Sequence, residues 1–297
     1  MFSFRAQGRG LHYSPLRGLV ENALRLAYAG GWPGAVWGSL PGRTEVQVWR
    51  ETLAIDGLRA PLRLAFASDL HIGPTTPPAL LERAFALLAE ARPDLLVLGG
   101  DYVFLDATPA RAETLRRLVA SVPAALKVAV LGNHDLWTRH ELLEAALEQA
   151  GARVLVNQAV TLPAPHDDVA ILGLDEPWTG RPDADRALAE VPEARVRLAV
   201  AHAPEGLHPL EGRGVSVLLC GHTHGGQLAL PGPRPLVVPG PTSRRHPFGR
   251  HTLGELSLYV SRGLGGIEVP MRSWAPPDVL LLTLEPASAP GQERHSA

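Results

Sequence analysis

The chain has 297 residues, enough to bury a substantial core in one large domain or two small ones. Its 28 basic and 30 acidic residues nearly balance, which argues against nucleic acid as an obligate partner, because duplex-binding proteins carry a strong basic excess. A single cysteine, Cys220, excludes an internal disulfide, and we interpret it as a small core residue.

Residues 1–44 form a basic segment that is amphipathic in part. Apolar residues recur at helical spacing between Leu16 and Ala27, near Arg17 and Arg25, and two tryptophans follow among glycines. No run of 18 apolar residues occurs, so we expect no membrane-spanning helix. Two interpretations stay open. The helix packs on its own domain, which we favour, or it lies on a membrane surface.

From residue 45 the pattern alternates between strands and helices. Short apolar runs predict strands at 46–49, 53–55, 62–67, 95–98, 128–131, 154–156, 169–172, 195–201, 215–219, 255–261 and 279–284. We expect helix N-caps at Thr76 and Thr108, and a capping box formed by Thr138 and Glu141. This alternation is typical of an α/β layered fold.

Polar side chains follow five of the apolar strands, at the point where each strand ends. They are Asp69 and His71, Asp101, Asn133 and His134, His202, and His222 with His224. Open α/β sheets form their ligand crevices at the carboxyl ends of strands. Four imidazoles, two carboxylates and one amide oxygen suit divalent first-row metals, and seven ligands are about right for two ions. The sequence therefore predicts a dinuclear metal site.

The ordered set Asp69-x-His71, Gly100-Asp101, Gly132-Asn133-His134-Asp135, His202 and Gly221-His222-x-His224 resembles the calcineurin-like metallophosphoesterase superfamily. The resemblance extends over about residues 62–284. The longer sequence segments 221–227, 259–265 and 270–272 resemble those of one bacterial branch of this superfamily. That branch contains phosphodiesterases, some of them associated with the cell envelope, and relatives that split UDP-diacylglucosamine. The resemblance implies a four-layer αββα sandwich with two mixed sheets. We expect this domain over residues 45–287, between the N-terminal segment 1–44 and a flexible tail, 288–297.

The resemblance also implies a role for each site residue. Asp69, His71 and His224 would hold one metal ion, Asn133, His202 and His222 would hold the other, and Asp101 would bridge them. A metal-bridging hydroxide would attack the phosphorus, with His134 as the general acid. Either Asp135 or Asp69 would orient His134. Manganese is favoured for the two divalent ions, and Fe, Zn, Ni and Co stay open.

We therefore predict a metal-dependent phosphodiesterase acting on a small phosphodiester or pyrophosphate. A membrane-surface pyrophosphatase acting on a nucleotide-linked lipid is the alternative, and a non-catalytic scaffold is disfavoured because every ligand position is filled. Arg262 is predicted to bind a substrate phosphate, with a structural role as the alternative. We expect a cytoplasmic protein, with peripheral membrane contact through residues 1–44 as the open alternative.

Overall fold

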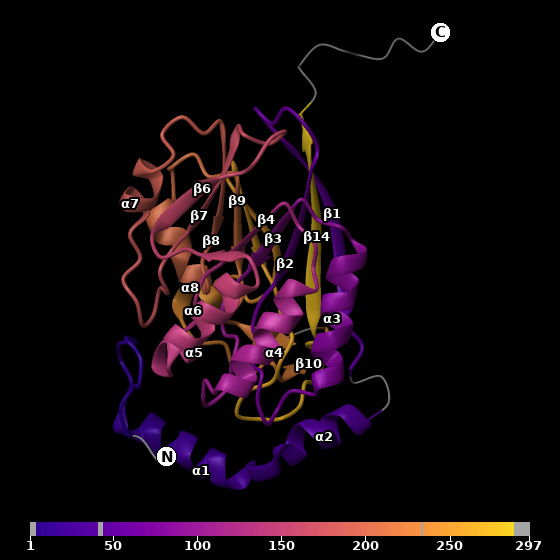
Figure 1. Ribbon diagram of the computed structural model, residues 1–297, viewed down its shortest axis with the longest axis vertical. Coiled ribbons are helices and arrows are strands. Elements are labelled where there is room, and N and C mark those ends of the chain that lie inside the picture. The colour runs from indigo at the N-terminus through magenta and orange to yellow at the C-terminus, as the bar shows by residue number, and fades with distance from the viewer. Residues whose placement is uncertain (1–3, 41–43, 233, 288–297) are drawn as a thin grey trace.

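The computed structural model describes residues 4–40, 44–232 and 234–287 (Figure 1). The predicted flexible tail, 288–297, lies outside these described residues. The boundary predicted near residue 44 stays a prediction, and the strands that build the sheets begin with β1 (Gln47–Ile55).

Two six-stranded mixed sheets form the centre of the molecule. The first has the order β1, β14 (Asp278–Pro286), β2 (Leu62–Ala67), β3 (Leu95–Leu98), β4 (Leu126–Ala129) and β5 (Ala152–Val154). The second has the order β12 (Gly249–Leu253), β13 (Leu256–Val260), β9 (Val217–Cys220), β8 (Val196–Val200), β7 (Val169–Gly173) and β6 (Gln158–Thr161). Strands β2 to β5 run parallel, as do β7, β8, β9 and β13, so the carboxyl ends of these strands share an edge in each sheet. A short ribbon joins β10 (Ala229–Leu230) to β11 (Arg234–Pro235).

The inner faces of the two sheets share one core. Successive side chains of a strand point to opposite faces, so a buried strand supplies two different cores. In β2, Leu64 and Phe66 enter the core between the sheets, and Ala65 faces the helices. In β9, Leu219 enters the same central core, while Cys220 packs against the helices of the second sheet and is fully buried, as expected for a core residue.

Helices cover the outer face of each sheet. Those on the first sheet are α3 (Pro78–Glu90), α4 (Pro109–Ala120) and α6 (His140–Gln149). The second sheet is covered by α7 (Ala184–Ala189) and by the 3-10 helix η2 (Pro204–Leu210), which contacts α8 (Pro241–Arg245). The short helices α5 (Asn133–Trp137) and η3 (His224–Gly226) begin at site residues. The predicted αββα sandwich is confirmed (Figure 1).

One of the three predicted helix caps is confirmed. The Thr108 hydroxyl accepts a hydrogen bond from the Arg111 N–H at the start of α4. Thr76 and Thr138 were wrong as caps, because each hydroxyl is used by a loop that is remote in sequence. Thr76 accepts from the Gly266 N–H, and Thr138 accepts from the Ala107 N–H.

The N-terminal helices lie along one end of the molecule (Figure 1). They are α1 (Pro15–Ala27), the 3-10 turn η1 (Ala29–Gly31) and α2 (Trp32–Ser39). Helix α1 packs on its own domain, as the favoured interpretation expects, but through its polar side, since Glu21 and Asn22 are buried while Leu16 and Leu19 are exposed. No helix in the described ranges is long and apolar enough to cross a membrane.

Candidate metal centre

The loops that leave β2, β3, β8 and β9 carry most of the predicted ligands, and backbone hydrogen bonds join the loop after β2 to that after β3 and the loop after β8 to that after β9. The Asp69 N–H donates to the Gly100 carbonyl at 2.8 Å, and the His71 N–H donates to the Asp101 carbonyl at 3.0 Å. Asp69, His71, Asp101, His222 and His224 all have φ between 45° and 69°. Left-handed backbone costs of order 1 kcal/mol or more at such residues and concentrates at functional sites, because the surrounding contacts must hold it in place.

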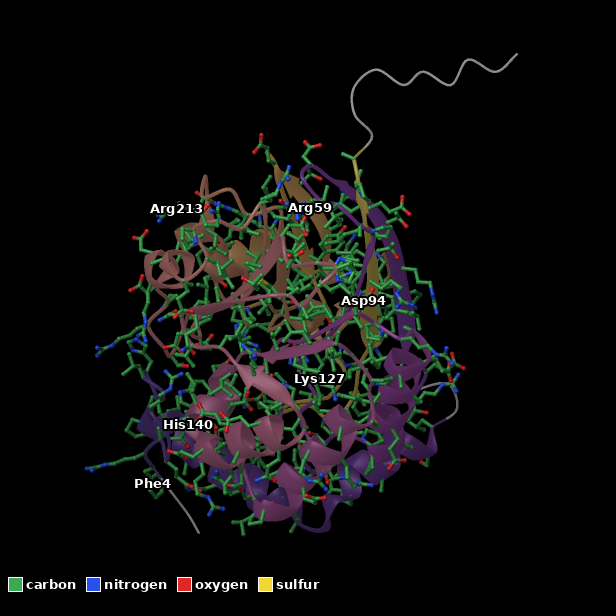
Figure 2. All side chains as sticks on the ribbon, turned by 45° about the horizontal axis from the view of Figure 1, so that its top comes forward. Phe4, Arg59, Asp94, Lys127, His140 and Arg213 are labelled. Carbon is green, nitrogen blue, oxygen red and sulfur yellow. The ribbon has the colours of Figure 1, made fainter. Side chains whose placement is uncertain are left out.

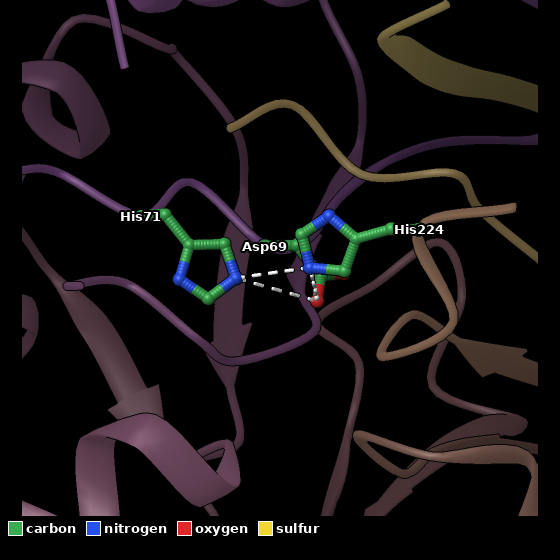
Figure 3. A group of neighbouring side chains, drawn as sticks. All are labelled: Asp69, His71 and His224. Atoms are coloured by element: carbon green, nitrogen blue, oxygen red, sulfur yellow. Dashed lines mark hydrogen bonds and ion pairs between the residues drawn. The ribbon is translucent and has the colours of Figure 1, made fainter. Parts of the chain in front are cut away.

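The first cluster consists of Asp69, His71 and His224 (Figure 3). The Nε2 atoms of His71 and His224 lie 3.0 Å apart, and Nε2 of His224 lies 3.4 Å from Oδ1 of Asp69. All three side chains are buried. Burial lowers the pKa of His71 to about 3, so this imidazole is neutral and offers a lone pair. Three ligand atoms therefore converge on one point, as metal binding requires.

The second cluster consists of Asp101, His202 and His222. Nε2 of His202 lies 3.3 Å from Oδ2 of Asp101 and 3.2 Å from Nδ1 of His222. Nδ1 of His202 donates to the Gly99 carbonyl at 2.8 Å, which fixes the ring with Nε2 toward the cluster. Burial lowers the pKa of His202, but Asp101 beside it raises that pKa to about 10, so a divalent cation at this position competes with a proton.

Asp101 faces both clusters with a single oxygen. Its Oδ2 lies 3.6 Å from Nε2 of His71 and 3.3 Å from Nε2 of His202. A carboxylate in this position is placed to bridge two ions, each with its own imidazole ligands.

One further ligand completes the fit to a pair of metal ions. Oδ1 of Asn133 is buried without a hydrogen-bond partner in the described part of the chain. An unpaired buried polar atom costs about 1–3 kcal/mol, and an amide oxygen is a metal donor. Asn133 begins α5, shortly after β4 ends, and lines the same cavity as Asp101 and His222. The seven predicted ligands thus fit a binuclear metal site.

His134 lies beside this centre. Its backbone N–H donates to Oδ1 of Asp101 at 2.9 Å, and its ring packs edge-on against the rings of His71 and Trp137. In the described chain, no hydrogen bond or ion pair joins this ring to Asp135 or Asp69, the two residues predicted to orient it. Asp135 instead accepts hydrogen bonds from backbone N–H groups of Gly132, Asp101 and Tyr102, and so holds the loops after β3 and β4 together.

Arg17 makes a polar contact with the His134 ring that sequence analysis did not predict. Its Nη2 lies 3.4 Å from Nδ1 of His134, and its guanidinium stacks over Trp137 at 4.8 Å. Ion pairs to Glu21 at 2.8 Å and to Glu268 at 3.0 Å hold it in the cavity wall. No motif connects helix α1 to residue 134, so only its position in the fold reveals the contact.

Arg272 supports the first cluster from behind. It is buried, and its Nη2 lies 3.0 Å from Nδ1 of His224 and donates to the Gly265 carbonyl at 2.6 Å. In the sequence analysis Arg272 appears only as part of segment 270–272, which resembles the bacterial branch.

Arg262, the predicted phosphate ligand, is placed elsewhere. Its guanidinium lies over the Phe248 ring at 4.6 Å, with Nη1 3.5 Å from Oδ2 of Asp278. It is absent from the described residues that line the cavity, and its contacts favour the structural alternative.

A cavity of about 910 Å³ opens onto the metal centre. Its polar wall holds Arg17, Asp101, Asn133, His134, His222 and His224. The rest of the wall is largely apolar and includes Trp137, Trp178, Leu228, Leu236, Val237, Ile267 and Val269. The site can therefore hold a charged phosphate at the centre and a large apolar or aromatic group beside it.

Comparison with known proteins agrees with this geometry. The family model described as calcineurin-like phosphoesterase matches residues 62–226. The chain is 33% identical over 238 residues to phosphodiesterase YaeI of Escherichia coli (strain K12), covering 76% of this chain and 83% of the relative. It is 29% identical to the uncharacterized metallophosphoesterase YkuE of Bacillus subtilis (strain 168), covering 73% of this chain and 77% of the relative. It is also 27% identical to UDP-2,3-diacylglucosamine pyrophosphatase LpxG of Chlamydia trachomatis, covering 74% of this chain and 83% of the relative.

The matched region contains all seven predicted ligands together with His134. With its two converging clusters of histidine and aspartate, the chain belongs to the calcineurin-like phosphoesterases, hydrolases that act on phosphate esters.

Proposed function

We propose that this chain is a dinuclear metal-dependent phosphodiesterase. The observation that carries the proposal is the position of Asp101, whose Oδ2 faces His71 of one cluster and His202 of the other. In this assignment Asp69, His71 and His224 hold one ion, Asn133, His202 and His222 hold the other, and Asp101 is shared. Two divalent ions there would lower the pKa of a shared water and neutralise the phosphoryl oxygens.

The remaining steps belong to the side chains of the cavity. We assign to His134 the donation of a proton to the leaving alkoxide. Burial lowers the pKa of its ring well below the ordinary value, and the negative charge of a bound phosphate would raise that pKa again. Arg17 lies against the His134 ring and adds a positive charge to the wall that the phosphate would meet. The apolar walls exclude water around the ester group.

Manganese is the metal we favour. Two carboxylates and the Asn133 amide oxygen join four imidazoles, a donor set that leans toward Mn or Fe among the first-row metals. Zn, Ni and Co are the comparison metals for the test.

The first experiment measures the metal content of the purified protein. Chelated protein is then reloaded with Mn²⁺, Fe²⁺, Zn²⁺, Ni²⁺ or Co²⁺ and assayed on bis-p-nitrophenyl phosphate and on p-nitrophenyl phosphate. We expect two metal equivalents per chain, highest activity with Mn²⁺, and faster cleavage of the diester. A single metal equivalent would contradict the dinuclear assignment, and faster cleavage of the monoester would contradict the phosphodiesterase assignment.

A second candidate is a pyrophosphatase acting on a nucleotide-linked lipid. It is favoured by the apolar wall of the cavity, and one relative is named as a UDP-2,3-diacylglucosamine pyrophosphatase. Hydrolysis of this UDP-linked diacyl sugar is compared with hydrolysis of the same compound lacking acyl chains. Equal rates on the two compounds would remove this candidate.

A further inference from the structure

Helix α1 turns its charged side toward the protein and its apolar side toward solvent. Arg17 pairs with Glu21 and Glu268, and Arg25 pairs with Asp106 at 2.9 Å. On the opposite side Leu16, Leu19 and Leu26 are 70%, 57% and 66% exposed. A surface helix of a soluble domain normally buries its apolar stripe, so this orientation requires an explanation.

Helix α2 continues the same surface. Trp37 is buried in the core of the first sheet, while Trp32, Val36 and Leu40 are exposed. We define the apolar face as the exposed large side chains of α1, α2 and the residue that follows, namely Leu16, Leu19, Val20, Leu26, Trp32, Val36 and Leu40. No exposed residue between 15 and 40 is charged.

Exposed large apolar side chains are confined to two parts of the described chain, residues 4–40 and residues 230–274. The second group consists of Leu230, Leu236, Val237, Val269, Met271 and Trp274. The two segments touch, since the Tyr28 hydroxyl donates to the Glu268 carbonyl at 2.7 Å and Arg17 pairs with the Glu268 side chain. The exposed apolar residues are therefore concentrated around one region of the molecule. On most protein surfaces such residues are scattered singly.

We propose that the apolar face docks on the surface of a lipid bilayer. A protein partner would need polar groups to pair with, because protein interfaces carry about one hydrogen bond per 100–200 Å² and a polar rim. The polar side chains exposed between residues 15 and 40 are Trp32 and Ser39, and both already donate to backbone carbonyls, of Ala27 and Val36. The hydrocarbon interior of a bilayer needs no hydrogen-bonding groups on the surface that enters it, and tryptophan favours the interface between lipid and water.

The helices fit an interfacial position and not a spanning one. Helix α1 has 13 residues and α2 has 8, whereas crossing a bilayer takes about 20. Arg17 and Val269 line the cavity and belong to the two segments that carry the exposed apolar residues, 4–40 and 230–274, so docking would hold the cavity beside the lipid surface. This docking does not depend on which phosphate ester the centre cleaves.

The test is co-sedimentation of the full chain with phosphatidylcholine vesicles, with and without added phosphatidylglycerol. Because the apolar face carries no charge, we expect binding to both kinds of vesicle and little loss at high salt. The variant Leu16→Gln/Leu19→Gln/Leu26→Gln should bind at least about tenfold more weakly, since three apolar side chains leave the contact. Absence of vesicle binding by the unmodified chain would overturn the proposal.

A second measurement keeps the test valid if the triple variant fails to fold. The only native cysteine, Cys220, is buried, so a thiol introduced at the surface can be labelled selectively with an environment-sensitive dye. Leu19→Cys reports on the apolar face. Arg213→Cys is the matched control, since Figure 2 shows Arg213 at the end of the molecule opposite Phe4.

We expect vesicles to shift the emission of the dye at position 19 to shorter wavelength and to leave the dye at position 213 unchanged. Equal responses at both positions would overturn the proposal. A third outcome is a shift at position 19 that grows with protein concentration in the absence of vesicles, together with a dimer in sedimentation velocity. That outcome would assign the apolar face to a second copy of the chain and would overturn the bilayer proposal.

Discussion

Nη2 of Arg17, in the first helix, lies 3.4 Å from Nδ1 of His134, a residue 117 positions further along the chain. The N-terminal helix thus supplies part of the cavity wall at the metal centre, although it precedes the region matched by the family model.

Replacement of Arg17 by Ala should lower kcat/KM for phosphodiesters by about tenfold to one hundredfold, the effect of losing a hydrogen bond or contact to a charged group. Both metal equivalents should remain, because in the described chain Arg17 pairs with Glu21, Glu268 and His134, none of which is one of the seven ligands. Arg25→Ala is the matched control, since Arg25 lies on the same helix and pairs with Asp106 outside the cavity. An equal loss in both variants would show that the attachment of α1 matters and not the guanidinium at His134.

Replacement of His134 by Ala should leave both metals bound and lower turnover by about 10²–10⁴-fold on esters with poor leaving groups. The loss should be smaller with p-nitrophenolate, which leaves without a proton. Metal analysis and a series of leaving groups measure both effects. His246→Ala, which removes a half-buried ring packed against His251, is the control and should keep its activity. Loss of a metal ion from the His134 variant would contradict its role as an acid.

Replacement of Asp101 by Asn should weaken the binding of both ions together, because Oδ2 of Asp101 faces His71 and His202 at once. We expect at least about a tenfold loss at each site, since even a lost supporting contact has this effect on metal affinity. Titration of chelated protein with Mn²⁺ in a calorimeter measures it. Asp94→Asn, at a surface ion pair with Arg63, should leave both affinities unchanged. If only one ion were lost, Asp101 would not be a bridge.

Replacement of Gly221 by Ala should disturb the first metal site more than the fold. A Cβ at this position would overlap Oδ2 of Asp69 and the hydroxyl of Ser68, so the Asp69 carboxylate must shift from the position in which it faces His71 and His224. Metal affinity is measured by titration and stability by thermal melting. Gly38→Ala is the control, because its Cβ would meet only Pro77, at 3.3 Å, on the surface near α3. Unchanged metal affinity in the Gly221 variant would contradict this reading of the site.

The strand ends were predictable because buried strands are short and uniformly apolar, and their polar neighbours mark the edge of the sheet. The runs at 62–67 and 95–98 coincide with β2 and β3, and the side chains after them, Asp69, His71 and Asp101, converge as predicted. The predicted strands at 46–49 and 53–55 form one continuous strand, β1, because its pairing with β14 runs without a break through the polar residues between them.

The features that escaped prediction depend on contacts between segments remote in sequence. The spacing of Leu16 and Leu19 indicates an amphipathic helix, but it does not say which side is buried. Ion pairs from Arg17 and Arg25 to Glu21, and the Tyr13 hydroxyl that donates to Glu21 at 2.9 Å, stabilise the buried polar side. The hydroxyls of Thr76 and Thr138 likewise accept hydrogen bonds from loops remote in sequence, which local sequence patterns do not reveal.

Each of the two clusters draws its side chains from both sheets. Asp69 and His71 leave the first sheet and meet His224 from the second, while Asp101 leaves the first sheet and meets His202 and His222 from the second. A bound ion therefore acts as a cross-link between the two halves of the sandwich, and neither cluster exists until both sheets have formed and docked. Metal uptake during refolding would thus follow the final assembly of the molecule, and a chain with one finished sheet would hold neither ion tightly.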